Sequence, residues 1–234
     1  MAPIIHTVNL RKVYAVGKER VIALNDVSIS IEKGEFCCIV GQSGSGKSTL
    51  LNQLAGLEKP TRGKVFIGSH EISAMTEDEL AKFRQAHLGF IFQSYNLLPT
   101  MTAAENVALP LMFKGISRSQ RLAMARALLH DSPIYVFDEA TSNVDAESEN
   151  DIMQAIHSLA GKKTIILISH RLANVVHSDC IYAMSNGRVI EQGTHAELLS
   201  QNGLYAKMWA EYEQAASWKI TAAADAAVTK GGEA

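Results

Sequence analysis

Residues 41–49, GQSGSGKST, combine glycines, a lysine and adjacent hydroxyl residues at the spacing G-x-x-x-x-G-K-[ST]. In such a loop the glycines let backbone N–H groups turn around a polyphosphate, the lysine supplies charge to the β and γ phosphates, and the next hydroxyl can bind Mg²⁺. The apolar run 36–40 precedes the loop and a helical pattern follows it, so the context is strand, loop and helix. This order favours a nucleoside triphosphate site over a glycine-rich surface turn. The predicted nucleotide-binding residues are Gly41, Gln42, Ser43, Gly44, Ser45, Gly46, Lys47, Ser48 and Thr49, with Ser48 also binding Mg²⁺.

A second group that could do chemistry is the acidic pair Asp138 and Glu139, which ends the apolar run 134–137. Successive strand residues point to opposite sides, so one carboxylate can enter the Mg²⁺ shell while the next faces an attacking water. We assign Asp138 to magnesium and Glu139 to the general base. An acidic pair at a strand end is more often only a solvated terminus. A phosphate loop in the same chain favours the catalytic interpretation.

A third candidate, His170, follows the apolar run 164–168. In a parallel sheet the carboxyl ends of the strands meet at one edge, so His170 is expected near the γ-phosphate or the lytic water. A lone histidine is more often an ordinary surface or core residue. Its position after a central strand favours a functional role.

Alternating strand and helix patterns position these residues. The runs 134–137 and 165–168 are apolar at every position, as a parallel sheet covered by helices on both faces requires. Asn186-Gly187 between two apolar runs predicts a hairpin. We expect strands at 4–10, 21–31, 36–40, 64–67, 88–93, 134–137, 164–168, 180–184 and 188–191. Helices are expected at 47–57, 76–86, 102–113, 119–130, 145–160, 171–177 and as a pair within 195–213.

Length and composition set the remaining bounds. The 234 residues, 47% of them hydrophobic, predict one domain over 1–213, followed by a disordered tail over 214–234. The net charge of −2 gives no basic field for nucleic acid. No window reaches the roughly 20 apolar residues that span a bilayer, and the N-terminus lacks the pattern of a signal peptide, so we expect a soluble, cytoplasmic protein. The three cysteines are expected to be small core residues.

These motifs, in this order, resemble the nucleotide-binding domain of ATP-binding cassette (ABC) transporters over residues 4 to about 213. The resemblance implies an α/β P-loop NTPase with a mostly parallel central sheet, antiparallel N-terminal strands and a helical subdomain, here shortened, at about 94–130. It further implies that Tyr14 stacks on adenine and that Gln93 joins Mg²⁺ to the transmembrane partner. The segment SNVD at 142–145 matches the loop through which two such domains communicate, and His170 matches the switch histidine.

The resemblance also implies an activity and partners. The chain would be the ATP-binding subunit of an ABC transporter, hydrolysing Mg·ATP to drive transport, with export favoured. Lys47 would supply charge to the phosphates, while Ser48, Gln93 and Asp138 surround Mg²⁺. Partners would be transmembrane permease subunits in separate chains and a second ATP-binding domain, as in a homodimer. The expected location is the cytoplasmic face of the membrane, without nucleic acid or a membrane span of its own.

One element of the family pattern is missing from the sequence. The family carries a second glycine-rich stretch, LSGGQ, through which each domain of a dimer closes over the ATP of the other, but the corresponding positions here are 114–118, KGISR. Up to about Arg121 the chain resembles macrolide-export and lipoprotein-release ATPases, and after it multidrug or lipid exporters, as in a hybrid chain or an internal deletion. The alternative function is therefore a nucleotide-binding module with impaired hydrolysis. A third hypothesis, an ATPase acting on nucleic acid or ribosomes, predicts a basic patch that the sequence pI near 6.4 disfavours.

Overall fold

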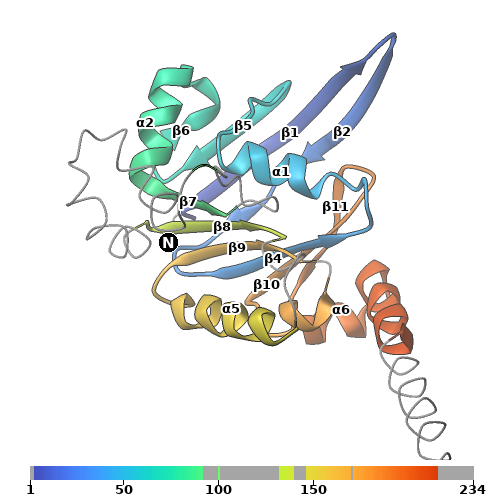
Figure 1. The fold of residues 1–234 in the computed structure, drawn as a ribbon. Helices are drawn as coiled ribbons and strands as arrows, with labels where there is room; N and C mark the ends of the chain where they lie inside the picture. Colours follow the sequence, from blue (N-terminus) through green and yellow to red (C-terminus); the bar gives the residue numbers. More distant parts are fainter. Residues whose placement is uncertain (1–2, 92–99, 101–131, 140–145, 170, 216–234) are drawn as a thin grey trace, which may run out of the picture.

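The fold contains a largely antiparallel sheet and a largely parallel one (Figure 1). The computed structural model describes residues 3–91, 100, 132–139, 146–169 and 171–215. The antiparallel sheet has the order β2-β1-β5-β6, with β3 also paired to β1. Its strands are β1 (Ile5–Val16), β2 (Glu19–Val27), β3 (Ser30–Ile31), β5 (Arg62–Ile67) and β6 (His70–Glu71).

The second sheet has the order β11-β10-β4-β9-β8-β7 and is parallel except for its edge strand β11. Its strands are β4 (Phe36–Gly41), β7 (Leu88–Ile91), β8 (Ile134–Asp138), β9 (Thr164–Ile168), β10 (Cys180–Ser185) and β11 (Arg188–Gly193). Asn186 and Gly187 join β10 to β11 with φ of 50° and 71°, the positive values that a tight hairpin turn requires. The predicted parallel sheet, antiparallel N-terminal strands and hairpin are confirmed.

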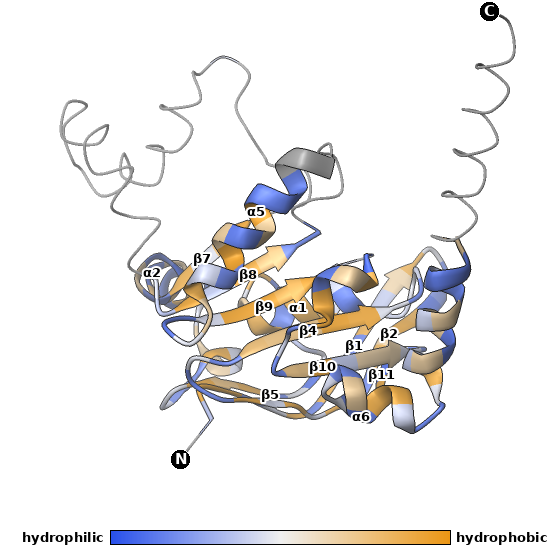
Figure 2. Cartoon of the chain, turned by 90° about the horizontal axis from the view of Figure 1, so that it is seen from below, coloured by the Kyte–Doolittle hydropathy of each residue, from blue (hydrophilic) through white to orange (hydrophobic). Residues whose placement is uncertain are grey.

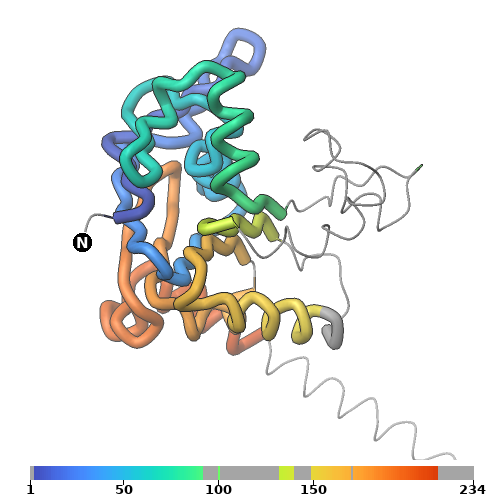
Figure 3. Tube along the Cα trace, turned by 90° about the vertical axis from the view of Figure 1, so that its left-hand side faces the viewer, coloured from blue at the N-terminus to red at the C-terminus, as the bar shows by residue number. Residues whose placement is uncertain are grey.

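Helices cover both faces of the parallel sheet, and Figure 3 shows α5 on the side away from α1 and α2. The helical elements are α1 (Lys47–Leu54), η1 (Ile72–Ala74), α2 (Glu77–His87), α5 (Ala146–Leu159), η2 (Leu172–Val175), α6 (His195–Ser200) and a helix over 204–215. Thr76 begins α2 and Thr194 begins α6, each through a capping box that satisfies N-terminal N–H groups. In the described part of the chain, no helix is long and apolar enough to cross a bilayer.

The core forms two layers because the central strands are buried on both faces. Along β4, Cys37 and Ile39 pack on the side of α1 and α2, whereas Phe36, Cys38 and Val40 pack toward α5. Figure 2 shows the apolar residues gathered in these strands and on the inner side of α5. All three cysteines are buried and free, as predicted. The loops that follow these strands are therefore supported by an apolar sheet that has no solvated face.

Several predicted boundaries are wrong. The strand expected at 21–31 is divided into β2 and β3 by residues 28–29, which follow the β2 bulge at Asp26, where φ is 63°. The first strand runs on to Val16, since its second half pairs with β2. The helix after the phosphate loop ends at Leu54, and the helix expected at 171–177 is only the 3₁₀ turn η2. The C-terminal helix extends to residue 215, into the expected tail, while 102–113, 119–130 and 216–234 lie outside the described residues.

Candidate functional site

The glycine-rich loop connects β4 to α1 at the carboxyl edge of the parallel sheet. Lys47, the first residue of α1, is 5% exposed, and its Nζ donates to the carbonyl oxygens of Gly41 and Gln42, both at 3.0 Å. Burial lowers the pKa of Lys47, and the nearby carboxylates Glu139 and Asp138 act in the opposite direction. The lysine is thus a desolvated cation held against the loop backbone.

The loop is braced by two segments that are distant in sequence. The N–H of Gly187 in the β10–β11 turn donates to the Ser45 carbonyl at 3.0 Å, and the N–H of Asn25 in β2 donates to the Gly187 carbonyl at 2.8 Å. Gly46 has a φ of 100°, and a Cβ there would lie 2.4 Å from the Ala23 carbonyl oxygen. The loop therefore depends on close backbone packing that only glycine permits.

The two carboxylates stand at the same edge, at the end of β8. Asp138 is the last residue of β8 and pairs with Ile168 of β9. Glu139 follows with a φ of 50°, and its N–H donates to the Ile168 carbonyl at 3.1 Å. Both carboxylates act on the pKa of Lys47. The structure brings together the lysine and the acidic pair that the sequence singled out.

Tyr14 lies in β1 beside the same loop. Its hydroxyl donates to Glu58 Oε2 at 2.5 Å, and Lys12 Nζ lies 3.3 Å from the same oxygen and 5.2 Å from the ring centroid. Burial and the Glu58 hydrogen bond raise the pKa of Tyr14, while a hydrogen bond with the Thr49 side chain lowers it. The interaction with Thr49 places the tyrosine at the start of α1.

A buried carboxylate connects α5 to the segment that follows β9. Glu149, with 4% of its side chain exposed, forms an ion pair with Arg171 and accepts a hydrogen bond from Asn174 Nδ2 at 2.9 Å. Ser169 Oγ accepts from the Arg171 N–H at 3.1 Å. Both sides of position 170 are therefore held by side-chain contacts.

The predicted residues Gln93, His170 and 142–145 lie outside the described residues. Sequence reasoning missed Glu58, Ala23 and Gly187 as partners of the site. The dipeptide Asn186-Gly187 did signal a turn, but no pattern in the sequence connects that turn to the phosphate loop.

The loop as described fits a bound polyphosphate. A helix leaves its first N–H groups without intrahelical partners, and α1 begins at this loop. Ser45 Oγ is buried without a hydrogen-bond partner among the described residues. With Lys47 nearby, these donors form an anion cradle, and the carboxylates beside it supply oxygen ligands of the kind that Mg²⁺ prefers.

Known protein sequences are similar to this chain. The family described as ABC transporter matches residues 24–121. An uncharacterized ABC transporter ATP-binding protein of Thermotoga maritima is 36% identical over an alignment of 221 positions, which covers 81% of this chain and 94% of that protein. The macrolide export ATP-binding/permease protein MacB of Hyphomonas neptunium is 34% identical over an alignment of 231 positions, which covers 85% of this chain but 36% of that protein. The chain thus spans about a third of MacB.

Solved structures agree with the sequences. The ATP-binding cassette MJ0796, in a dimeric post-hydrolysis state bound to ADP and Pi, aligns with a TM-score of 0.74 and 33% identity, covering 81% of this chain and 98% of that one. MJ0796 is a protein of Methanocaldococcus jannaschii. A bacterial Atm1-family ABC exporter with ATP bound aligns with a TM-score of 0.68 and 30% identity, covering 90% of this chain and 42% of the exporter.

Proposed function

This chain belongs to the ATP-binding proteins of ABC transporters, a family of P-loop ATP hydrolases, and from that premise we propose that it drives export together with a membrane permease. The observation that carries the proposal is the joint placement of Lys47, Asp138 and Glu139 at one sheet edge. Export is supported by the relatives, which include a macrolide export protein and an Atm1-family exporter. Acting with a permease, the chain would lie at the cytoplasmic face of the membrane.

The phosphates of ATP would be held by the backbone of 41–49, with Lys47 exchanging its two carbonyl contacts for phosphate oxygens. The ring of Tyr14, fixed through Glu58, would stack on the adenine. Ser48, Asp138 and Gln93 would hold Mg²⁺, which neutralises developing charge on the phosphates when bound.

Glu139 would accept the proton of the attacking water. Its N–H is tied to the Ile168 carbonyl, so the backbone that carries the carboxylate is held by the neighbouring strand. A fixed base loses less entropy on reaching the reactive geometry. Lys47 stabilises negative charge that develops on the phosphate oxygens, and His170 is proposed to contact the γ-phosphate from the end of β9.

A second candidate is a nucleotide-binding module with impaired hydrolysis. It is favoured by the absence of the string LSGGQ from the sequence, with KGISR at 114–118 in its place. The alignment with the Thermotoga relative is 221 positions long but takes up 81% of this chain, about 190 residues, so that relative has residues where this chain has none. A shortened chain would weaken closure of two domains over ATP.

Steady-state Mg·ATPase activity across a range of protein concentrations separates the two candidates. A working dimer predicts activity that rises more than linearly with concentration and disappears in Glu139→Gln. Nucleotide titration of both proteins is the control for binding. If ATP binds equally to both and turnover is the same in both, the hydrolytic proposal fails and the binding module stands.

A further inference from the structure

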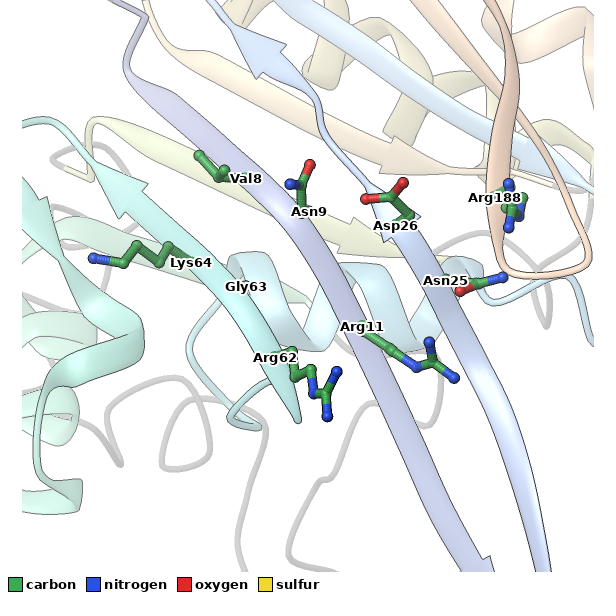
Figure 4. A pocket seen from close by; sticks show the side chains of 9 residues that line it. All are labelled: Val8, Asn9, Arg11, Asn25, Asp26, Arg62, Gly63, Lys64 and Arg188. Atoms are coloured by element: carbon green, nitrogen blue, oxygen red, sulfur yellow. The ribbon is translucent and has the colours of Figure 1, made fainter.

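A concentration of basic residues lies away from the phosphate loop, on the antiparallel sheet (Figure 4). A pocket of about 570 Å³ opens over β1, β2 and β5 beside the start of β11. Its lining contains four basic side chains and one acidic one: Val8, Asn9, Arg11, Asn25, Asp26, Arg62, Gly63, Lys64 and Arg188. Val8 is the one large apolar side chain among them. The pocket therefore carries a local excess of positive charge in a chain whose net charge is −2.

The pocket belongs to the face of the sheet opposite the nucleotide loop. Side chains alternate along a strand, so Arg11 and Tyr14 project to opposite faces of β1. Tyr14 contacts Thr49 on the side of α1, and Figure 4 shows α1 behind the sheet when the pocket faces the viewer. An anion in this pocket would therefore not share the phosphate loop.

Two of the arginines face each other across paired strands. Arg11 in β1 is the direct register partner of Arg62 in β5. Like charges directly opposite each other destabilise a sheet, since such side chains typically stand about 5 Å apart at Cβ. The ion pairs among the described residues are Lys12–Glu58, Lys64–Glu71 and Arg171–Glu149. Within that part of the chain, no carboxylate forms an ion pair with Arg11, Arg62 or Arg188. A bound anion would remove this repulsion.

The backbone around the pocket is also unusual. Between Val8 and Arg11, β1 has two residues opposite the single Gly63 of β5, and on its other side Asp26 is an extra residue of β2. Asn9, Asp26 and Gly63 all have positive φ, at 48°, 63° and 90°. A Cβ on Gly63 would lie 2.4 Å from the Asn9 carbonyl oxygen. Bulges that re-aim side chains, and strained residues grouped together, are concentrated at binding sites.

From the facing arginines and the paired bulges we infer that this pocket binds a soluble anion carrying two or more phosphate groups. The planar guanidinium forks match phosphate oxygens in pairs. The cations come from three segments of chain, β1, β5 and the β10–β11 hairpin, and this spread favours an anion with more than one charged group. Val8 is the one large apolar side chain of the lining, so charged and polar groups set the chemistry of the ligand.

The test is calorimetric titration of inorganic pyrophosphate into the protein at low salt, with the phosphate loop already saturated by a non-hydrolysable ATP analogue. One additional site is expected. Arg11→Gln and Arg62→Gln should each weaken pyrophosphate binding at least tenfold. Asp26→Asn should tighten it several-fold, because it removes the one negative charge of the lining. Lys207→Gln, which removes an exposed positive charge from the C-terminal helix, is the matched control and should leave binding unchanged.

Absence of pyrophosphate binding, or binding that neither arginine variant weakens, would overturn the inference. Equal weakening by Lys207→Gln would also overturn it, because the effect would then come from net charge. Co-sedimentation with phosphatidylglycerol vesicles is the second arm. Arginine-dependent vesicle binding without pyrophosphate binding would identify a lipid headgroup in place of a soluble anion. Thermal unfolding of each variant checks folding, and removing one of two facing arginines should not lower Tm.

Discussion

At the scale of single residues, the proposed general base is also a strained one. Glu139 has a φ of 50°, in the left-handed region that costs a non-glycine residue roughly 1 kcal/mol or more. Its N–H donates a hydrogen bond to the Ile168 carbonyl, so the neighbouring strand β9 maintains this conformation. Such strain lowers the stability of the folded state, and at a functional position it sets the geometry of the side chain.

Replacing Glu139 by glycine should release that strain. We expect Glu139→Gly to abolish ATP turnover while raising the free energy of unfolding by about 0.5–1 kcal/mol, since glycine adopts positive φ without a steric penalty. Urea denaturation monitored by circular dichroism measures the change. Glu139→Gln is the matched control, with turnover lost and stability unchanged. A destabilised glycine variant would show that contacts of the carboxylate outweigh the backbone strain.

The proposed role of Tyr14 rests on its ring, whereas its hydroxyl is already used by Glu58. Tyr14→Phe should therefore retain ATP affinity within about twofold. Tyr14→Ala should weaken it by roughly 5- to 150-fold, because stacking of a base on an aromatic ring contributes about 1–3 kcal/mol. Titration with a fluorescent ATP analogue compares the variants. Equal losses in both would assign the contribution to the hydroxyl.

At the scale of elements, the phosphate loop takes its shape from the β10–β11 hairpin and β2. Gly187 has a φ of 71°, and a Cβ there would lie 2.6 Å from the Ala23 carbonyl oxygen. Gly187→Ala should thus cost about 2 kcal/mol or more of stability and weaken nucleotide binding as the loop shifts. Thermal unfolding and nucleotide titration measure the two effects.

Gly17 provides the control for backbone strain alone. It has a similar φ of 61° in the β1–β2 turn, but a Cβ there would meet nothing within 4 Å. Gly17→Ala should cost about 1 kcal/mol through strain and leave nucleotide affinity unchanged. If both substitutions changed affinity equally, the hairpin could not be the brace of the loop.

The elements also show what the sequence could and could not predict. Runs such as 134–137 identify the central strands because every position is apolar, and the loop motif locates the anion cradle within a few residues. The extension of β1 through Tyr14 depends on pairing with β2, which lies later in the chain. The local sequence pattern does not predict this pairing. The contacts of Gly46 with Ala23 and of Gly187 with Ser45 join distant segments, so they appear only in three dimensions.

At the scale of the whole molecule, the parallel sheet holds thiols at its centre. Cys37 and Cys38 lie in β4, and Cys180 of the neighbouring strand β10 is the register partner of Cys37. Burial raises the pKa of all three, that of Cys38 to about 12 from an ordinary value of 9.0. The thiols stay neutral inside the sheet, whereas unfolding would let them ionise in alkaline solution.

The stability of the whole fold should therefore fall as pH rises above 9. Above pH 9 the unfolded thiol loses its proton while the folded thiol keeps its own, so the unfolded state is favoured, for Cys38 by about 1 kcal/mol at pH 10. The raised pKa of Tyr205, about 12, acts in the same direction.

Urea denaturation at pH 7 and pH 10 tests this expectation. Between the two pH values, the free energy of unfolding should fall by about 1 kcal/mol less in Cys38→Ala than in the parent chain. Because Cys38 packs in the apolar layer against α5, the variant starts from a lower stability, so the difference between the two pH values is the quantity compared. Burial at 0% exposure is the reason for the prediction. Identical differences in both proteins would mean that Cys38 ionises as readily in the folded sheet as in the unfolded chain, and would contradict it.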